Sequence, residues 1–193
     1  MPRWEQGAEE RLREAALQLF LEHGYENVTV AQITERAGLT RRTFSRYFAD
    51  KRDVLFAGSE QLPGALAEAV ANADAALAPF EALLSAVAQV GDVVTTRVAP
   101  HAAQRQVIID GSPELQERGL SKFAAVAAAL DGALQRRGAG PSTAGFLADI
   151  GVAVFRTAFG RWVAAPDEAT FSERVREAAD ELGRALVPAS ADG

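Results

Sequence analysis

The stretch TVAQITERAGLTRRTFSRYFADKRDVL, residues 29–55, decides the fold of this chain. Val30 and Ile33 recur at helical spacing, and Gly38 tolerates the positive φ that ends a helix. Thr40 is a good N-cap for a second helix, because its hydroxyl can accept a hydrogen bond from an amide of the first turn. The stretch therefore predicts two short helices joined by a glycine turn, followed at once by a third helix.

The second of these helices has two chemically different faces. Leu39, Phe44 and Phe48 fall on an apolar side that can pack against a core. The opposite face carries Arg41, Arg42, Ser45 and Arg46. Arginine can donate two hydrogen bonds to guanine and serine can reach base or phosphate, so this face suits reading of the DNA major groove. Six Lys or Arg residues against one Asp between residues 36 and 52 also favour a polyanionic partner.

The composition of the whole chain is that of a globular protein with a core of its own. The chain has 193 residues, of which 48% are hydrophobic and 24% charged. The formal net charge is −6, but residues 1–56 carry as many cationic as acidic side chains. The acidic excess therefore lies in the C-terminal part, and the net charge does not argue against a DNA-binding N-terminal part.

Several functional classes are excluded by what the chain lacks. It contains no cysteine, which excludes disulfides, thiolate metal sites and cysteine nucleophiles. His23 and His101 are the two histidines, and neither a G-x-S-x-G elbow nor a glycine-rich phosphate loop is present. We therefore expect no enzyme, no catalytic residue, no metal site and no cofactor. Without an apolar signal-peptide core or an uninterrupted apolar run of about 18 residues, we expect a cytoplasmic protein with no membrane partner.

The chain as a whole predicts an all-α fold of about nine helices in two domains. Residues 1–50 should form a three-helix helix-turn-helix head after a mobile arm at residues 1–7, and residues 51–193 a helical body that binds a ligand and dimerises. The first helix should end near His23, where Gly24 is a natural stop. The expected core of the head consists of Leu19, Phe20, Ile33, Phe44 and Phe48.

The residues LQLFLEHGYENVTVAQITERAGLTRRTFSRYFADKRDVL resemble the DNA-binding head of TetR-type (TetR/AcrR) transcriptional repressors, and the resemblance covers about residues 11–55 without gaps. It implies an all-helical homodimer that binds a double-stranded DNA operator, with a pocket in the body for an unknown small-molecule effector. The positions carried over to DNA bases are Arg41, Arg42, Thr43, Ser45 and Arg46. Those carried over to DNA phosphates are Thr29, Tyr47 and Lys51. Ser45 departs from the family pattern, which usually has Tyr or Phe at this position. The operator sequence of a relative therefore cannot be assumed for this chain.

A fourth helix should couple the head to the body. Asp50 is a suitable N-cap for it, and Pro63-Gly64 interrupts its pattern. Because proline removes a hydrogen bond and clashes with the preceding turn, we expect either a kink or a break near Leu62. Five further helices are expected at 79–98, 101–110, 113–137, 142–164 and 167–187, each with a proline near its start, before a polar tail at residues 188–193.

The body offers candidates for a ligand pocket and for a dimer interface. The pocket candidates are Leu66, Phe80, Leu84, Val87, Val107, Phe123, Ala127 and Phe155. The interface candidates, on the last two helices, are Phe155, Phe159, Trp162, Phe171, Val175, Leu182 and Leu186. For both sets the alternative is ordinary core packing in a single subunit. Arg97, His101, Arg105 and Arg118 either meet an anionic group at a pocket mouth or are solvated surface residues.

These patterns together predict a ligand-responsive, homodimeric DNA-binding regulator, most simply a repressor that a small hydrophobic or amphipathic ligand releases from a palindromic operator. The alternative is a helical interaction or scaffold protein without sequence-specific DNA binding, in which the arginines form only a solvated charged face.

Overall fold

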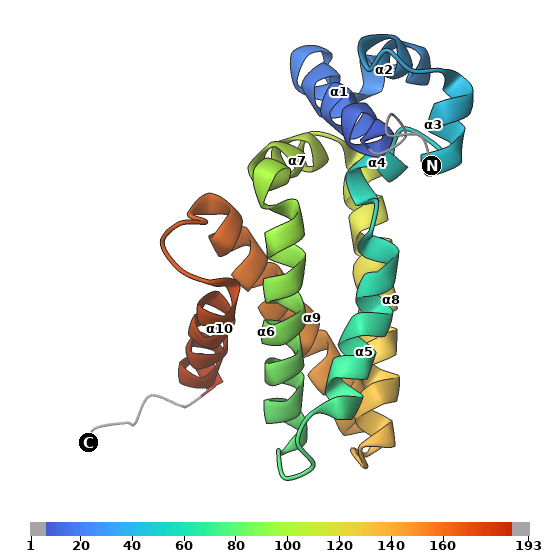
Figure 1. The fold of residues 1–193 in the computed structure, drawn as a ribbon. Helices are drawn as coiled ribbons and strands as arrows, with labels where there is room; N and C mark the ends of the chain where they lie inside the picture. Colours follow the sequence, from blue (N-terminus) through green and yellow to red (C-terminus); the bar gives the residue numbers. More distant parts are fainter. Residues whose placement is uncertain (1–6, 187–193) are drawn as a thin grey trace. The chain divides into compact units, whose positions relative to one another are not determined.

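The computed structural model describes residues 7–186, so the expected tail at 188–193 and all of the expected arm except Gly7 lie outside the described residues. Helices are the regular elements of this part of the chain, which confirms the all-α prediction (Figure 1). The α-helices are α1 Ala8–His23, α2 Val30–Arg36, α3 Arg41–Tyr47, α4 Asp53–Phe56, α5 Leu62–Asn72, α6 Pro79–Val98, α7 Ala102–Asp110, α8 Pro113–Arg136, α9 Pro141–Ala164 and α10 Phe171–Leu186. The 3₁₀ turns are η1 Tyr25–Asn27, η2 Ser59–Gln61 and η3 Ala99–His101.

The helix ends follow the glycine and proline signals of the sequence. Gly24 and Gly38 take positive φ values of 80° and 63° directly after α1 and near the end of α2. A proline occupies the first turn of α6 and of α9, where its missing amide hydrogen costs little. The long helices therefore start close to their expected positions, except that α10 starts at Phe171, after a turn at residues 165–170.

The expected fourth helix is broken, and the break lies earlier than Pro63. Helix α4 has only four residues, and Gly58 follows it with φ 81°, a left-handed conformation that a right-handed helix cannot contain. Helix α5 then begins at Leu62, so Pro63 lies in its first turn and breaks no hydrogen bond. The chain thus forms two separate helices joined by residues 57–61, which is a break rather than a kink.

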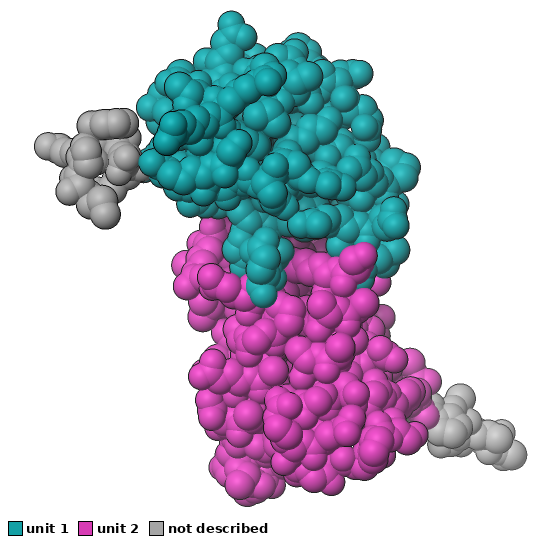
Figure 2. Space-filling view, turned by 90° about the vertical axis from the view of Figure 1, so that its right-hand side faces the viewer, with its two compact units in different colours: residues 1–60, 101–120 teal, residues 61–100, 121–193 magenta. Residues whose placement is uncertain are grey.

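The chain divides into two compact units, coloured separately in Figure 2. Unit 1 comprises residues 1–60 and 101–120, and unit 2 comprises residues 61–100 and 121–193. Unit 1 therefore extends beyond the expected boundary at residue 50 and takes in α7 and the first turns of α8. The reason is hydrophobic: Ile108 and Leu115, far along the sequence, are buried in the same core as the three N-terminal helices.

The core of unit 1 contains all five residues expected there. Leu19, Phe20, Ile33, Phe44 and Phe48 are each at most 4% exposed. Polar side chains complete it by satisfying helix ends: the Arg11 guanidinium donates to the carbonyl oxygen of Ala37 at the end of α2. The head is thus fixed by apolar packing together with side-chain bonds to backbone.

Unit 2 is built from long helices that approach one another closely. Helix α10 packs on α6 and α9, and α5 packs on α6 (Figure 1). The ring of Phe171 lies against Gly91, where an added Cβ would come within 1.9 Å of a ring carbon. The Arg137 guanidinium donates to the carbonyl oxygens of Val70, Ala73, Asp74 and Leu77 and so satisfies the C-terminal end of α5.

Two helical segments, Pro79–Asp110 and α9, are long and apolar enough to cross a membrane by length and composition, each with a window of mean hydropathy 1.2. This is weak support for a membrane span, because core helices of soluble proteins meet the same test. Helices α6 and α9 pack against each other within unit 2. Their small apolar residues Ala82, Ala86, Ala148 and Ala158 are buried in this packing unit.

Candidate nucleic-acid interface

Helix α2 begins with a complete capping box. The Thr29 hydroxyl accepts from the amide of Gln32 at 3.3 Å, and the Gln32 side chain accepts from the Thr29 amide at 2.8 Å. These bonds satisfy two backbone donors that a seven-residue helix would otherwise leave free. Thr29, predicted to contact phosphate, is exposed and fixed in place at the start of α2.

Helix α3 is anchored at its start and along its inner face. The Thr40 hydroxyl accepts from the Thr43 amide at 3.1 Å. Phe44 and Phe48 are 1% and 3% exposed, and their ring centroids lie 5.4 Å apart. Because aromatic packing and a cap both fix the helix, the orientation of its outer face is fixed as well.

The outer face of α3 presents the predicted base-reading residues to solvent. Arg41, Arg42, Ser45 and Arg46 are exposed, and Thr43 is half-buried beside Thr40. Arg46 donates to the Tyr47 hydroxyl at 2.9 Å and stacks 4.9 Å from the centroid of that ring. Arg41 and Arg42 lie in the first turn, which is the part of a recognition helix that contacts base edges.

Ion pairs neutralise part of the positive charge of residues 36–52. Arg36 pairs with Glu22 at 2.7 Å, and this hydrogen bond lowers the pKa of Glu22. Arg52 pairs with Asp50 and, at 3.0 Å, with Glu114. The hydrogen bond from Arg52 lowers the pKa of Asp50. With these two arginines ion-paired, the outer face of α3 becomes the cationic surface of the head.

The ammonium group of Lys51, which is predicted to contact phosphate, contacts the protein backbone. Its ammonium group donates to the backbone carbonyl oxygens of Tyr25, Glu26 and Val28 at 2.8, 3.3 and 3.1 Å. It also lies 4.2 Å from the centroid of the Tyr25 ring. An ammonium group has three N–H donors, so these carbonyls account for all of them. Of the three phosphate candidates, Thr29 is exposed, Tyr47 is half-buried, and Lys51 binds the protein backbone.

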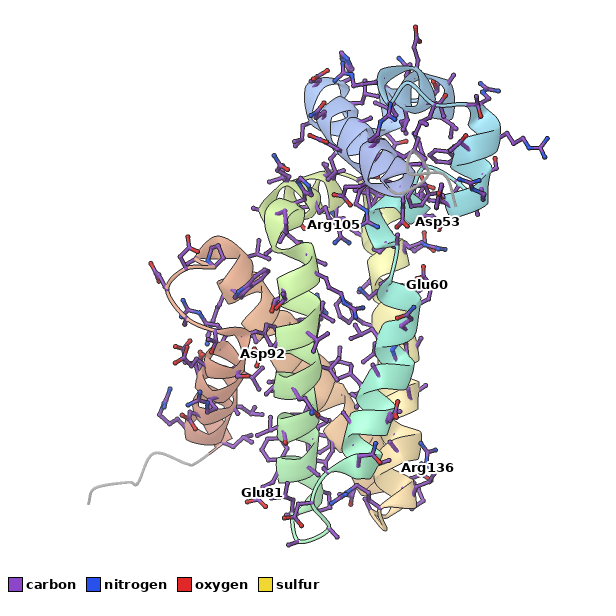
Figure 3. The ribbon with its side chains drawn as sticks, viewed as in Figure 1. Asp53, Glu60, Glu81, Asp92, Arg105 and Arg136 are labelled. Carbon is purple, nitrogen blue, oxygen red and sulfur yellow. The ribbon has the colours of Figure 1, made fainter. Side chains whose placement is uncertain are left out.

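Polar contacts join α7 and the start of α8 to the head. Arg105 donates to the Leu55 carbonyl oxygen near the end of α4, and burial lowers the pKa of Arg105 to about 10 (Figure 3). Arg118 pairs with Asp53 at 2.9 Å. Both arginines therefore bind α4 within unit 1, Arg105 from a half-buried position and Arg118 from an exposed one. No local sequence pattern signals such contacts, because the partners are more than forty residues apart.

The predicted ligand-pocket residues are divided between the two units. Val107 is 64% exposed and belongs to unit 1, whereas the other seven belong to unit 2. Leu66 and Val87 are fully buried, and Phe155 is 5% exposed, so these three are core residues. The Phe155 and Phe171 rings contact each other with centroids 5.4 Å apart, and the Leu83 side chain lies against Gly151, so packing fills part of the space that small residues were expected to leave open.

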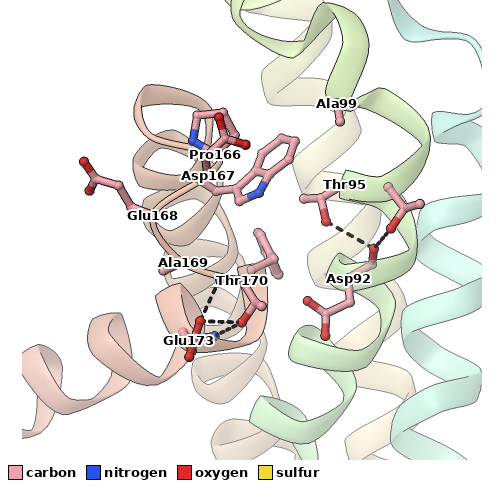
Figure 4. Close-up of a pocket in the computed structure, with 12 residues that line it drawn as sticks. Asp92, Thr95, Ala99, Pro166, Asp167, Glu168, Ala169, Thr170 and Glu173 are labelled. Carbon is pink, nitrogen blue, oxygen red and sulfur yellow. Dashed lines mark hydrogen bonds between the residues drawn. The ribbon is translucent and has the colours of Figure 1, made fainter.

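A surface groove of about 630 Å³ lies elsewhere in unit 2, between α6, the end of α9 and the turn before α10 (Figure 4). None of the eight predicted pocket residues lines it. Its polar groups bind one another: Asp92 accepts from the Ser172 amide at 3.1 Å, and Glu173 accepts from the Thr170 amide at 2.7 Å. These bonds cap the start of α10, which is a structural use of the groove's carboxylates.

The predicted dimer interface is largely internal core. Phe155, Trp162, Phe171 and Val175 are between 1% and 6% exposed within a single chain, so they are not available to a partner. They are apolar because they join α9, α10 and α6 of one chain. The remaining interface candidates are the half-buried Phe159 and Leu182 and the 69% exposed Leu186.

Residues 12–57 match the family described as bacterial regulatory proteins, tetR family. The chain is 26% identical over 132 residues to MftR of Mycobacterium tuberculosis, whose name links it to regulation of mycofactocin biosynthesis. That match covers 68% of this chain and 66% of MftR, slightly under two thirds of its length.

Solved structures share the fold over nearly the whole chain. NalD of Pseudomonas aeruginosa, the secondary repressor of the MexAB-OprM multidrug efflux pump, superposes with a TM-score of 0.63 at 18% identity, covering 95% of this chain and 98% of NalD. FadR of Thermus thermophilus, a TetR-family repressor in complex with lauroyl-CoA, gives a TM-score of 0.52 at 21% identity, covering 96% and 98%.

A helical protein that presents arginines from the second helix of a capped helix-turn-helix belongs to the helix-turn-helix class of DNA-binding proteins. The match of residues 12–57, the relatives and the fold support a TetR-type transcriptional regulator, as the resemblance in the sequence indicated. Within residues 7–186, no group of three or more His, Asp or Glu side chains is arranged to bind a metal ion.

Proposed function

We propose that this regulator is a cytoplasmic homodimer that represses transcription by binding a palindromic operator. The observation that carries the proposal is the outer face of α3, where Arg41 and Arg42 are exposed on a helix fixed by the Thr40 cap and by Phe44. A rigid helix keeps the guanidinium groups in register with base edges, which bidentate recognition of guanine requires.

The positions of the side chains on the head suggest which of them contact bases and which contact phosphates. Arg41, Arg42 and Ser45 read bases, with Thr43 supporting the first turn through its contact with Thr40. Arg46, stacked on Tyr47, extends this surface at the far end of α3, where the pair can reach base or phosphate. Thr29 contacts phosphate from the start of α2. In a twofold dimer, two such heads would bind half-sites about 34–36 Å apart.

The proposed dimer contact uses the outer faces of α9 and α10, because their inner faces are buried. Phe146 on α9 is 67% exposed and Leu186 on α10 is 69% exposed, while Phe159 is half-buried. Isolated exposed apolar residues are common, but Phe146 and Leu186 lie on two helices that pack against each other, which supports a shared contact surface. Phe146→Asp should then yield monomers in light scattering, and a dimer that persists would place the interface elsewhere.

Release by a small hydrophobic or amphipathic ligand is the last part of the proposal. The fold-level similarity to FadR, solved with lauroyl-CoA, supports an acyl compound as a first candidate. A ligand that binds one head spacing better than another would shift the population away from the DNA-binding state. The experiment is operator release, measured by fluorescence anisotropy, on addition of acyl-CoA compounds of increasing chain length.

DNA binding itself is tested by selection of duplexes from a random pool on the wild-type protein. The proposal predicts recovery of one palindromic motif. Recovery of unrelated sequences, or of none, would favour the alternative of a helical interaction protein. Arg136→Ala, which removes an exposed arginine of α8, should leave the recovered motif unchanged.

A further inference from the structure

Lys51 is bound in a way that suggests a role other than phosphate contact. It lies just before α4, and its ammonium group donates to three carbonyl oxygens of the connector between α1 and α2. The Tyr25 ring closes the fourth side, with its centroid 4.2 Å from the nitrogen. The charged end of the Lys51 side chain is therefore surrounded by these carbonyl oxygens and the Tyr25 ring.

The connector that Lys51 binds leads directly to the DNA-binding helices. Residues 25–27 form the 3₁₀ turn η1, and Val28 is the last residue before the N-cap of α2. The Tyr25 carbonyl oxygen also accepts from the Val28 amide at 3.3 Å, but a short turn has too few amides to satisfy all three carbonyl oxygens fully. The Lys51 ammonium supplies the missing donors.

Further side chains fix the same connector. Ser112, at the start of α8, donates to the Glu26 carboxylate at 3.0 Å, and Asn27 donates to the His23 carbonyl oxygen at 2.9 Å. Tyr25 is 5% exposed and packs on Phe20, with ring centroids 5.2 Å apart. The path of the chain into α2 is thus determined from several directions, and Lys51 contributes the largest number of bonds to it.

We infer that Lys51 is a positioning residue for DNA recognition: it fixes the connector, and thereby Thr29 and the start of α2, and its charge does not neutralise a phosphate. The inference rests on the proposed DNA binding. It replaces the expectation that Lys51 grips the DNA backbone with a role inside the head. The positioning role and the phosphate contact can be distinguished by two substitutions of Lys51, one that keeps the positive charge and one that removes it.

Lys51→Arg keeps the positive charge but replaces a compact ammonium by a planar fork that cannot direct its donors to three converging carbonyl oxygens. Lys51→Met removes the charge and keeps the length of the apolar stem. The experiment measures the affinity of wild type, Lys51→Met and Lys51→Arg for a duplex recovered by selection, between low and moderate salt, together with thermal unfolding of each variant.

The positioning role predicts that both variants bind about tenfold or more weakly, as expected for lost bonds to a charged group. It also predicts that the slope of log affinity against log salt stays at the wild-type value for both. A phosphate contact predicts the opposite pattern. Lys51→Arg would bind like wild type, and Lys51→Met would lose about 0.9 from the slope for each protomer. That pattern would overturn the inference.

A measurement on the free wild-type protein keeps the inference testable if Lys51→Met does not fold. Nuclear magnetic resonance of the side-chain ammonium should show Lys51 protons protected from exchange, with couplings to carbonyl carbons that persist after DNA is added. Rapidly exchanging protons in the free protein, or a coupling to phosphorus in the complex, would contradict it. If the wild type binds no DNA but the Lys51 protons are protected, the proposed function fails. The bonds from Lys51 to the connector between α1 and α2 are then still supported.

Discussion

Units 1 and 2 are both helical, but different forces determine their structures. Helices α2, α3 and α4 of unit 1 are at most seven residues long, and caps and long polar side chains satisfy their ends. Helices α6 and α9 of unit 2 have 20 and 24 residues and associate by close contact of glycine and alanine with large side chains. Short helices have little intrinsic stability, so unit 1 depends on its polar anchors more than unit 2 does.

The difference also explains which roles the sequence reveals. Capping residues and the glycines that end helices act on residues within three or four positions. The helix ends can therefore be predicted from the neighbouring sequence. The packing of long helices depends on partners far along the chain. The apolar residues of α9 therefore predict burial, but not whether the buried contact lies within one subunit or between two.

The largest expected effect is on the core of unit 1. Phe44→Ala should lower the free energy of unfolding by about 3–5 kcal/mol, because the ring is 1% exposed and its removal leaves a cavity. Leu120→Ala is the control, since Leu120 is 59% exposed, and should change the stability by less than about 0.5 kcal/mol. Urea denaturation followed by circular dichroism measures both. Equal effects would contradict the described packing of α3.

The next effect tests the close packing of unit 2. Gly91→Ala should cost about 1–3 kcal/mol, because the added Cβ would overlap the Phe171 ring and force α6 and α10 apart. Gly160→Ala in α9 has nothing within 4 Å of its new Cβ and should instead stabilise the protein by up to about 1 kcal/mol. Thermal unfolding of the two variants should therefore shift in opposite directions; a shared direction would count against the contact.

A smaller effect is expected at the start of α2. Thr29→Ala removes the hydroxyl that accepts from the Gln32 amide and should cost about 1 kcal/mol of stability. Thr29→Ser keeps the cap and should be close to wild type. Hydrogen exchange at the Gln32 amide gives a local measurement: it should accelerate in Thr29→Ala and not in Thr29→Ser. Unchanged exchange in both would show that the cap does not stabilise α2.

The smallest effect concerns pH. The hydrogen bond from Arg52 lowers the pKa of Asp50 in the folded protein, so the folded state favours the charged carboxylate. The resulting stability is fully present above the ordinary aspartate pKa of about 3.9 and is lost as pH falls through the lower folded value. Asp50→Asn should reduce stability at neutral pH and flatten the acid limb of the stability curve. An unaltered acid limb would exclude a contribution from Asp50.

Much of unit 1 could be predicted from the sequence. Thr29 and Thr40 are caps, Gly24 and Gly38 are stops, and Phe44 is buried, because each position has a local physical reason. What could not be predicted are the bonds of Lys51 and Arg105 to distant carbonyl oxygens. A long cationic side chain has the same sequence pattern whether its charge meets DNA, solvent or backbone.

In the body, the sequence predicted the helices more accurately than the roles of individual residues. The break after α4 lies at Gly58 rather than near Leu62, because proline is compatible with the first turn of a helix, whereas a left-handed glycine cannot lie inside a right-handed helix. Phe155 and Phe171 were predicted to lie in a pocket or an interface, with ordinary core packing as the alternative. Their mutual contact at 5.4 Å shows that hydrophobicity indicated only burial.

The central claim, that the outer face of α3 reads DNA, is tested most directly by Arg42→Ala in competition between a selected duplex and random-sequence DNA. If Arg42 contacts a base, the variant should lose about 1–3 kcal/mol of affinity for the selected duplex and relax the preference at one base pair, with a smaller loss on random DNA. An unchanged ratio of specific to random affinity, for Arg42→Ala and for Arg41→Ala, would contradict the claim.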